Sequence, residues 1–528
     1  MTMRILIAEN IAEEGIQYLN SQSLDVTVNT KLTREELLKI IPEYDALIVR
    51  SVTKVNEELY EHAKNLKVVG RAGNGVDNIE LSGATERGII VVNTPDANTV
   101  SAAEHTIALM LSMSRNIPRA NQHIKSKLWD RSLFRGVELM GKTLGIIGLG
   151  RIGTMVATRM QSFGMEVIAY DPYIRNDKFE RLGIKKAEQL DELLKASDFI
   201  SVHTPKTPET IGIINAGSFK IVKPGVRVVN CARGGIIDEA ALNEALLSGI
   251  VAGAAIDVLK DEPHPISPLL DLDTTVITPH LGADTFEAQK NVGETVAKEV
   301  FEALSGKLVA NAVNLPTLSQ QELEHMKPYL TLIERMGKLY HQIHREAVDK
   351  IEFTYKGEFS HRNTDPYVLA FVKGLYETVL DTPVTYVNAR LLAESRGVSI
   401  SESRVTSNDN YTSSIKIVLH SKDNSFELEG ALFGKGEPRI VSLNGYPVDM
   451  VPRGNMLMIE NNDSPGMIGK IGLALGNKGI NISTMNVSLS REKSPALMLL
   501  TVDDTVSTDV LDEIQDQEGI LKAWALKI

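Results

Sequence analysis

The stretch 143-TLGIIGLGRIGTMVATRM-160 decides the fold of the middle of the chain. An apolar strand runs into Gly148, Gly150 and Gly153, and these glycines open a helix. The order predicts a dinucleotide-binding turn, in which the first glycine turns the chain, the second admits a pyrophosphate and the third lets helix and sheet pack closely. Asp171 ends the next apolar segment, eighteen residues beyond Gly153. A carboxylate there binds the ribose and repels a 2′-phosphate, which favours NAD over NADP.

Strands and helices alternate on both sides of this stretch. Six strands of one doubly wound sheet are predicted at 144–147, 167–170, 199–203, 226–230, 252–257 and 275–278. Three more are predicted nearer the N-terminus, at 4–8, 46–49 and 68–70. Such alternation produces parallel sheets with helices on both faces. The fold class is therefore α/β, with two doubly wound parallel-sheet units, one flavodoxin-like and one of Rossmann type.

Two capping-box patterns mark predicted helix starts in this region. Thr33 with Glu36 opens a helix that runs to 41, and Ser101 with Glu104 opens an unusually apolar helix through 113. The apolar composition of the second helix predicts that it is buried.

The pattern changes after Pro316. Residues 317–452 mix a helical stretch with strands at 414–420 and 439–443, which predicts an α+β unit without a sharp motif. A compact unit then follows from 453 to 528. It has a strand at 456–460, a turn whose Pro465 is expected just inside a helix, and a strand at 480–483 beyond Gly479.

Composition bounds the function classes. A chain of 528 residues suggests three or four domains. Its net charge of −12 argues against a general affinity for nucleic acid or acidic membranes. The single cysteine, Cys231, excludes an internal disulfide and a cysteine-built zinc site, and no metal site is expected. Neither an export signal nor a membrane-spanning stretch is visible, so we expect a cytoplasmic protein.

Three polar residues follow predicted strands of the central unit, where ligands of such sheets bind. They are Arg233, Glu262 and His280. A guanidinium grips a carboxylate, an imidazole takes a hydroxyl proton near neutral pH, and a carboxylate orients the imidazole. The set therefore suits oxidation of a hydroxy acid. Singly, each residue also fits a structural role, as a sheet-edge brace, a solvated turn residue or a capped loop histidine.

The N-terminal unit carries cations at comparable positions. Arg50 with Ser51 and Arg71 end apolar strands, and the glycines at 73 and 75 are expected to expose backbone N–H groups. This arrangement favours anion binding over surface ion pairing. Cys231 lacks an adjacent base, so we expect it to line the cofactor site rather than to act as a nucleophile.

The motifs GLGRIG, YDP, HTP, NCARGG, DEP and PHLGA occur in this order and resemble the D-isomer-specific 2-hydroxyacid dehydrogenases. The resemblance implies a substrate domain formed by 1–97 and 289–316 around an NAD domain at 98–288. It makes Arg233, Glu262 and His280 catalytic, with His280 the proton donor or acceptor. Glu262 replaces the glutamine of the related formate dehydrogenases, which argues against formate. The implied cofactor-binding residues are Asn74, Gly148, Gly150, Arg151, Ile152, Gly153, Asp171, Thr204, Cys231, Ala232, Arg233, Asp257, His280, Leu281, Gly282 and Ala283.

The C-terminal part narrows the resemblance. Asp463-Ser-Pro-Gly-Met-Ile-Gly469 with Asn481-Ile-Ser483 resembles the ACT module, a small amino-acid-sensing ββαβ-type unit that pairs across subunits. Asp463 and Asn481 match its effector-binding positions. The stretch 437–446 resembles the end of an intervening domain. Together these units indicate the branch of the family that oxidises 3-phosphoglycerate to 3-phosphohydroxypyruvate, the first step of serine biosynthesis. L-serine is then the expected effector, and a homodimer or homotetramer the expected assembly.

This branch implies where the substrate binds. Arg233 and the backbone of Asn74 and Gly75 are expected to hold its carboxylate. Arg50, Ser51 and Arg71 are expected to hold its phosphate, with Arg131 a candidate that reaches over from a partner subunit. Two alternatives stay open: a reductase for 2-oxoglutarate, glyoxylate or hydroxypyruvate, and a non-enzymatic NAD-sensing protein of the dehydrogenase fold.

Overall fold

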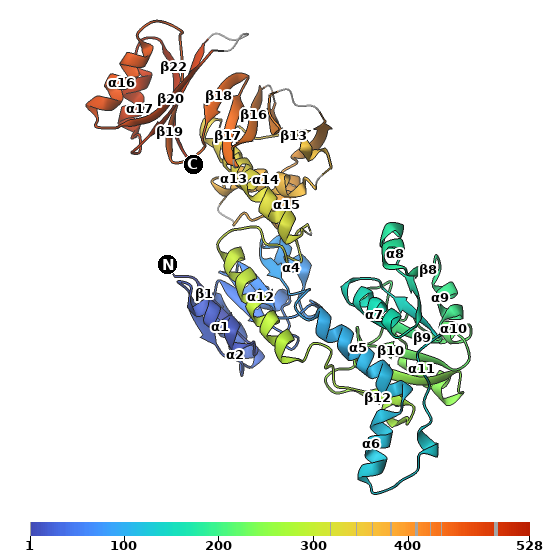
Figure 1. Cartoon of the computed structure of the whole chain (residues 1–528). Coiled ribbons are helices and arrows are strands. Elements are labelled where there is room, and N and C mark those ends of the chain that lie inside the picture. The colour runs from blue at the N-terminus through green and yellow to red at the C-terminus, as the bar shows by residue number, and fades with distance from the viewer. Residues whose placement is uncertain are drawn as a thin grey trace.

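The computed structural model describes residues 2–316, 318–344, 346–361, 363–380, 383–406, 410–422, 424–434, 436–489 and 495–528. These residues form four β-sheets, which follow one another along the chain. The N-terminal sheet lies between the second sheet and the two C-terminal sheets (Figure 1).

The N-terminal sheet has five parallel strands in the order β2-β1-β3-β4-β5. This order is that of the flavodoxin-like class that the sequence predicted, although only β1, β3 and β4 were predicted as strands and β2 and β5 were missed. The capping box at Thr33 is also confirmed, since its side chain accepts from the Glu36 N–H and Glu36 accepts from the Thr33 N–H. The elements are β1 (Arg4–Ile7), α1 (Glu13–Asn20), β2 (Asp25–Val28), α2 (Arg34–Ile40), β3 (Ala46–Val49), α3 (Glu57–His62), β4 (Val68–Arg71), α4 (Leu81–Glu86) and β5 (Ile90–Val92).

The second sheet is parallel and has the order β12-β11-β10-β9-β6-β7-β8. All six predicted strands are present. The sequence missed β8, because two residues are too few to produce an apolar pattern. The strands are β6 (Thr143–Ile147), β7 (Glu166–Tyr170), β8 (Lys185–Lys186), β9 (Phe199–Val202), β10 (Val226–Asn230), β11 (Val251–Ile256) and β12 (Thr275–Ile277). The helices are α5 (Thr99–Ser114), α6 (Ile117–Lys125), α7 (Arg151–Ser162), α8 (Asn176–Leu182), α9 (Leu190–Ala196), α10 (Ala216–Phe219) and α11 (Glu239–Leu247).

Helix α5 corrects one prediction. It is largely buried, as expected, but the capping box at Ser101 is wrong. The chain is already helical from Thr99, with Asn98 at the cap position. The Ser101 hydroxyl is therefore free to donate elsewhere, and it does so to the carbonyl of Gly282 at 2.8 Å.

Helix α12 (Phe286–Leu304) returns the chain to the N-terminal sheet and lies beside α1 (Figure 1). Its valines at 296 and 300 pack under β4 so closely that a Cβ at Gly70 would lie 2.5 Å from a Val300 methyl group. The following segment pairs with β5, where Ala312 bridges to Val92. Residues far apart in the sequence thus complete one unit.

The third sheet is mixed and has the order β14-β13-β15-β16-β17-β18, with α13 and α14 packed together beside it. The predicted strands at 414–420 and 439–443 are confirmed as β15 and β17. The elements are α13 (Gln320–Ile343), β13 (Lys350–Gly357), α14 (Asp365–Glu377), α15 (Ala389–Ser395), β14 (Ser399–Val405), β15 (Ser413–Ser421), β16 (Asn424–Phe433), β17 (Glu437–Leu443) and β18 (Tyr446–Met450).

The last sheet is antiparallel, in the order β20-β21-β19-β22. Its element order is β-α-β-β-α-β, longer than the ββαβ pattern that was expected. Pro465 stands before the helix rather than inside it, because Gly466, with φ +93°, turns the chain into Met467. The elements are β19 (Asn455–Asn461), α16 (Met467–Asn477), β20 (Ile482–Ser488), β21 (Ala496–Val502), α17 (Thr508–Gln515) and β22 (Ile520–Lys527).

The buried side chains show which units share a core. One continuous apolar cluster runs from Ile5 and Val296 of the N-terminal unit through Leu332 and Phe353 to Leu526. The second sheet instead has two clusters of its own, one on each face. Within the described residues, no helix has the length and apolarity that crossing a membrane requires.

Candidate active site

The glycine-rich turn between β6 and α7 has the geometry that the sequence predicted. Gly148 has φ +93°, and a Cβ there would lie 2.8 Å from the His203 carbonyl oxygen. A Cβ at Gly153 would lie 2.1 Å from the Gly148 carbonyl oxygen, whereas one at Gly150 would meet open space. Asp171 accepts from the Leu149 N–H at 2.9 Å, so it also fixes the turn itself. The turn therefore offers a bare approach for a pyrophosphate at Gly150.

Further residues around this turn fit a dinucleotide. The Thr204 hydroxyl is buried and has no hydrogen-bond partner among the described residues. It lies at the turn, since its methyl group would be 2.9 Å from a Cβ at Gly148. Arg151 begins α7 and pairs with Asp96 at 2.5 Å. A bound cofactor would supply a partner for this unsatisfied buried hydroxyl at the glycine turn.

Two other side chains at the carboxyl edge of this sheet, those of Cys231 and His203, are uncharged near neutral pH. Burial raises the pKa of the Cys231 thiol to about 12. Burial lowers the pKa of His203 to about 4, and its ring contacts the Ser201 hydroxyl at 2.8 Å. Neither a thiolate nor an imidazolium forms there near neutral pH.

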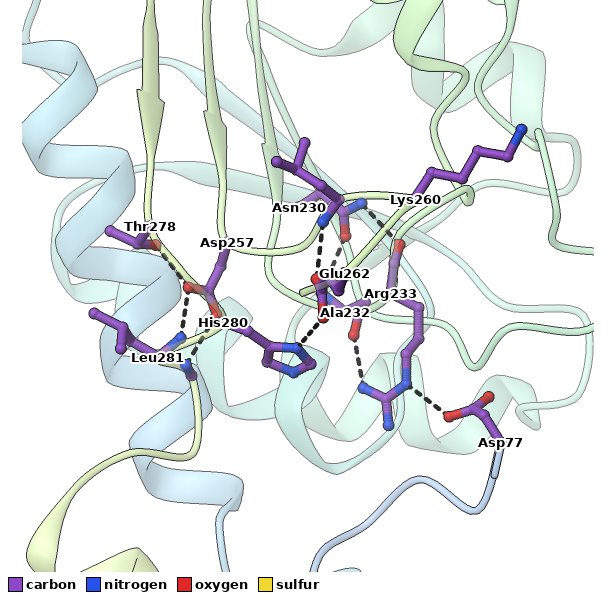
Figure 2. A network of polar contacts seen from close by, with 12 residues as sticks. Asp77, Asn230, Ala232, Arg233, Asp257, Lys260, Glu262, Thr278, His280 and Leu281 are labelled. Atoms are coloured by element: carbon purple, nitrogen blue, oxygen red, sulfur yellow. Dashed lines mark hydrogen bonds and ion pairs between the residues drawn. The ribbon is translucent and has the colours of Figure 1, made fainter. Parts of the chain in front are cut away.

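His280 and Glu262 form a hydrogen-bonded imidazole–carboxylate pair (Figure 2). His280 Nδ1 lies 2.7 Å from Glu262 Oε2. The other oxygen, Oε1, accepts from the Leu259 N–H at 2.9 Å, which fixes the carboxylate. Burial raises the pKa of Glu262, but the hydrogen bond and charge of His280 outweigh it and leave that pKa below its ordinary value. The ionised carboxylate holds the Nδ1 proton, and Nε2 is left to exchange a proton with a substrate.

Asp257 organises the loop that carries His280. Its side chain is buried, and it accepts from the N–H groups of Leu281 at 2.8 Å and Gly282 at 2.9 Å (Figure 2). Thr278 donates to it at 2.6 Å, and the His280 N–H donates to its backbone carbonyl at 2.9 Å. The carboxylate therefore acts on the loop backbone from inside the protein.

Arg233 reaches from the second sheet to the N-terminal unit. Its Nε donates to Asp77 Oδ2 at 3.3 Å, and its Nη1 donates to the Ala232 carbonyl at 2.7 Å (Figure 2). Asn230 holds the loop from both ends, because it donates to the Arg233 carbonyl and accepts from the Ala232 N–H, each at 3.0 Å. Arg233 Nη2 would lie 2.0 Å from a Cβ at Gly75, so the guanidinium rests directly on that glycine.

Three arginines make the neighbouring edge of the first sheet cationic. Burial, followed by repulsion from Arg233 and Arg50, lowers the pKa of Arg71 to about 10. Arg71 Nε is buried without a hydrogen-bond partner in the part of the chain that is described. Its Nη1 would lie 1.6 Å from a Cβ at Gly73, so this glycine also makes room for a guanidinium. Clustered cations with unused donors form a site for an anion.

Not every predicted site residue lies in this group. Ser51 is exposed beside Arg50. Arg131 precedes the 3-10 helix Ser132–Phe134, which follows α6 in the sequence. Helix α6 lies at the end of the second unit that is remote from the first sheet (Figure 1). Asp463 and Asn481 are exposed in the last unit, and the Asn481 N–H donates to Asp503 at 2.8 Å.

The sequence analysis missed three residues of the site: Asp77, Ser101 and His105. Asp77 pairs with Arg233, and His105 Nε2 lies 3.1 Å from Asp257 Oδ1. Ser101 was named only for a capping-box pattern. The partners of all three residues lie 150 or more residues away along the chain, so no local signal could have identified these contacts.

Family models match two parts of the chain. Residues 107–282 match the D-isomer specific 2-hydroxyacid dehydrogenase NAD binding domain. Residues 325–444 match the D-3-phosphoglycerate dehydrogenase intervening domain.

Curated relatives match over nearly the whole length. The D-3-phosphoglycerate dehydrogenase of Archaeoglobus fulgidus is 46% identical over 100% of both chains. That of Methanocaldococcus jannaschii is 43% identical over 98% of both. Among solved structures, the D-lactate dehydrogenase of Aquifex aeolicus with NAD and lactic acid is 29% identical, with a TM-score of 0.52, and covers 57% of this chain and 96% of its own.

Proposed function

Because the chain belongs to the D-isomer-specific 2-hydroxyacid dehydrogenase family, among its D-3-phosphoglycerate dehydrogenases, we propose that the residues around His280 carry out that reaction. The enzyme oxidises D-3-phosphoglycerate to 3-phosphohydroxypyruvate with NAD, the first step of serine biosynthesis. The observation that carries the assignment of roles is the position of Arg233, which lies beside the His280–Glu262 pair (Figure 2) and is also near enough to Arg71 to lower the pKa of Arg71.

His280 removes the proton of the substrate hydroxyl. Its Nδ1 is committed to Glu262, so Nε2 is the atom that accepts this proton. The Glu262 carboxylate, whose pKa is depressed, stabilises the imidazolium that results. NAD supplies the acceptor for the hydride that leaves C2.

Different arginines bind the two negative groups of the substrate. Arg233 has Nη2 unused beside Gly75 and is placed to grip the carboxylate next to the reacting carbon. Arg71, with Arg50 near it, provides buried positive charge for the phosphate. The N–H groups of Asn74 and Gly75 have no acceptor within the described part of the chain and add donors for the carboxylate.

Two sets of residues hold the cofactor. The turn at Gly148, Gly150 and Gly153 binds the pyrophosphate, and Asp171 binds the ribose. Thr204 and the 280–283 loop border the remainder. These residues would hold NAD next to the loop that carries His280.

A reductase for another 2-oxo acid is the alternative that shares these reacting groups. The charge distribution disfavours glyoxylate and hydroxypyruvate, because their single carboxylate leaves Arg71 without a counter-charge. 2-Oxoglutarate has two carboxylates, so only the turnover assay below separates it from 3-phosphoglycerate. A ligand with two anionic ends uses all three arginines.

The C-terminal units are assigned to regulation and assembly. The β-α-β-β-α-β unit at 453–528 is proposed as an ACT module, with exposed Asp463 and Asn481 available to an effector such as L-serine at a paired module. We propose the unit boundaries 1–97 with 289–316, 98–288, 317–452 and 453–528, and the division of the strands into four sheets supports them.

Homodimerisation is proposed through the surface of α5 and the C-terminal end of α7. A groove of about 410 Å³ there is lined by side chains such as Ile107 of α5 and Phe163, which follows α7. In the segment that follows α6, Trp129 is 82% exposed and Leu133 is 56% exposed. Exposed apolar groups of this size mark protein interaction sites.

The function is tested by following NADH formation at 340 nm with the purified enzyme, NAD and D-3-phosphoglycerate, with and without L-serine. We expect turnover with 3-phosphoglycerate that exceeds turnover with D-lactate or 2-hydroxyglutarate, and slower turnover when serine is present. Tight NAD binding without turnover of any 2-hydroxy acid would support a sensing protein instead. Turnover that ignores serine, together with no serine binding by calorimetry, would leave the last unit a role in assembly alone.

A further inference from the structure

One face of α5 rests against the loop that carries His280. Ser101 and His105 are four residues apart and therefore project from the same face, one turn from each other. Ser101 Oγ donates to the Gly282 carbonyl at 2.8 Å. His105 Nε2 lies 3.1 Å from Asp257 Oδ1 and 3.1 Å from Thr278 Oγ1. Helix formation does not need either contact, because α5 starts at Thr99.

Asp257 connects this face to the loop backbone. Its carboxylate is 1% exposed and accepts from the N–H groups of Leu281 and Gly282. Burial raises the pKa of Asp257, but bonds from His105 and Thr278 bring it below its ordinary value, so the group stays ionised. A buried carboxylate with donors on every side has one orientation, and a donor lost from α5 loosens that orientation.

The loop needs such support at His280 itself. His280 has φ +56°, a left-handed conformation that few residues other than glycine adopt. The bonds on both sides of it, from its own N–H to the Asp257 carbonyl and from the Leu281 N–H to the Asp257 carboxylate, hold this conformation. The direction of the imidazole towards Glu262 depends on them.

We propose that Ser101 and His105 are positioning residues, which clasp the 278–283 loop to α5 and keep the His280 imidazole aligned for proton transfer. Helix α5 follows directly on the chain that leaves the first sheet. The clasp therefore joins the catalytic loop to the connection between the two N-terminal units. The proposal rests on the proposed function, since it takes His280 as the proton acceptor.

The test compares four variants of the full-length enzyme. His105→Leu removes the donor, His105→Gln returns an amide donor at a similar distance, and Ser101→Ala removes the second contact. Ser114→Ala is the matched control, because Ser114 is also a buried serine of α5 but donates only to the Met110 carbonyl of its own helix. Each variant is assayed for kcat, for NADH affinity and, by mass spectrometry, for hydrogen exchange in the peptide that contains Leu281 and Gly282.

We expect His105→Leu to lower kcat on the order of 10-fold to 100-fold, the usual effect of losing a supporting contact. The 281–282 amides are expected to exchange faster. NADH affinity is expected to fall less than kcat, because the loop supplies only part of the cofactor site. His105→Gln should restore most of the kcat and most of the protection of the 281–282 amides that His105→Leu loses. Ser101→Ala should lower kcat by about threefold to tenfold. Ser114→Ala should have the kcat and the exchange rate of the wild type.

Three outcomes would contradict the proposal. The first is a folded His105→Leu variant whose 281–282 amides exchange at the wild-type rate, and the second is a kcat of this variant within twofold of the wild type. The third is a His105→Gln variant that restores neither kcat nor the exchange rate. If His105→Leu does not fold, Ser101→Ala decides by the same two measurements. Hydrogen exchange needs no turnover, so it reports on the clasp even if the wild-type enzyme does not oxidise 3-phosphoglycerate, a result that would count against the proposed function alone.

Discussion

The two parallel sheets of this enzyme are both built from alternating strands and helices, but they carry different residues at their carboxyl edges. The first sheet ends in Arg50, Arg71 and the glycines that make room for guanidinium groups. The second ends in the glycine turn and in the loops of Glu262 and His280. One edge therefore offers charge for binding, and the other offers a cofactor turn and a proton acceptor. Arg233 belongs to the second sheet but touches Asp77 of the first.

The hydrophobic cores of the first and second sheets also differ. The core of the first sheet continues into the C-terminal units, whereas the second sheet keeps its two clusters to itself. A rigid displacement of the second unit against all the rest would break few apolar contacts. Such a displacement would separate or join the binding edge and the reacting edge.

If the second edge performs the chemistry, His280→Ala should cause the largest loss of activity. The variant lacks the Nε2 that accepts the proton, and we expect kcat to fall on the order of 10²-fold to 10⁴-fold. The KM for 3-phosphoglycerate should change far less, because the arginines remain. Steady-state kinetics measure both. His62→Ala is the control, since His62 is exposed on α3 and contacts only the Glu58 carbonyl. A kcat near the wild-type value in folded His280→Ala would remove His280 from its role.

If the first edge only binds, Arg71→Met should produce the opposite pattern. Methionine keeps much of the apolar stem but removes the charge that faces the phosphate. Loss of a charge-assisted contact is expected to raise KM by about 10-fold to 100-fold, with kcat changed by less than about threefold. Arg34→Met is the control, because Arg34 pairs with Glu58 on the surface of the same unit. A fall in the kcat of Arg71→Met at constant KM would contradict the proposal that the edge of the first sheet serves only to bind the substrate.

Features set by repeating patterns could be predicted from the sequence. The order of strands and helices, the glycine turn and the carboxylate at 171 follow from apolar periodicity and fixed spacing. The pairing of His280 with Glu262 could be anticipated because both follow strands of one sheet. Strand β8 could not, since Lys185 and Lys186 carry no apolar signal.

Other features depend on the folded context. The same four-residue pattern is a capping box at Thr33 but not at Ser101, because Asn98 already starts the second helix. The sequence shows that Arg71 is a cation, but not that its Nε is buried without a partner. Contacts such as Arg233 with Asp77 join loops of different units, and only the folded chain brings them together.

The smallest expected effect concerns Cys231. The test asks whether this cysteine only lines the site or also reacts there. Burial raises the pKa of this thiol to about 12, so below that pH it stays protonated and is a poor nucleophile. With native enzyme at pH 8, we expect iodoacetamide to label Cys231 far more slowly than free cysteine, and labelling to become fast only as the pH approaches 12 or the chain unfolds. Intact-mass spectrometry measures the labelled fraction, with the urea-unfolded chain as the control for reactivity. We also expect Cys231→Ser to keep kcat within about threefold, because the thiol takes no part in proton transfer. Complete labelling of the native enzyme within minutes at pH 8, or a loss of kcat as large as that of His280→Ala, would give the thiol a chemical role at the reacting edge.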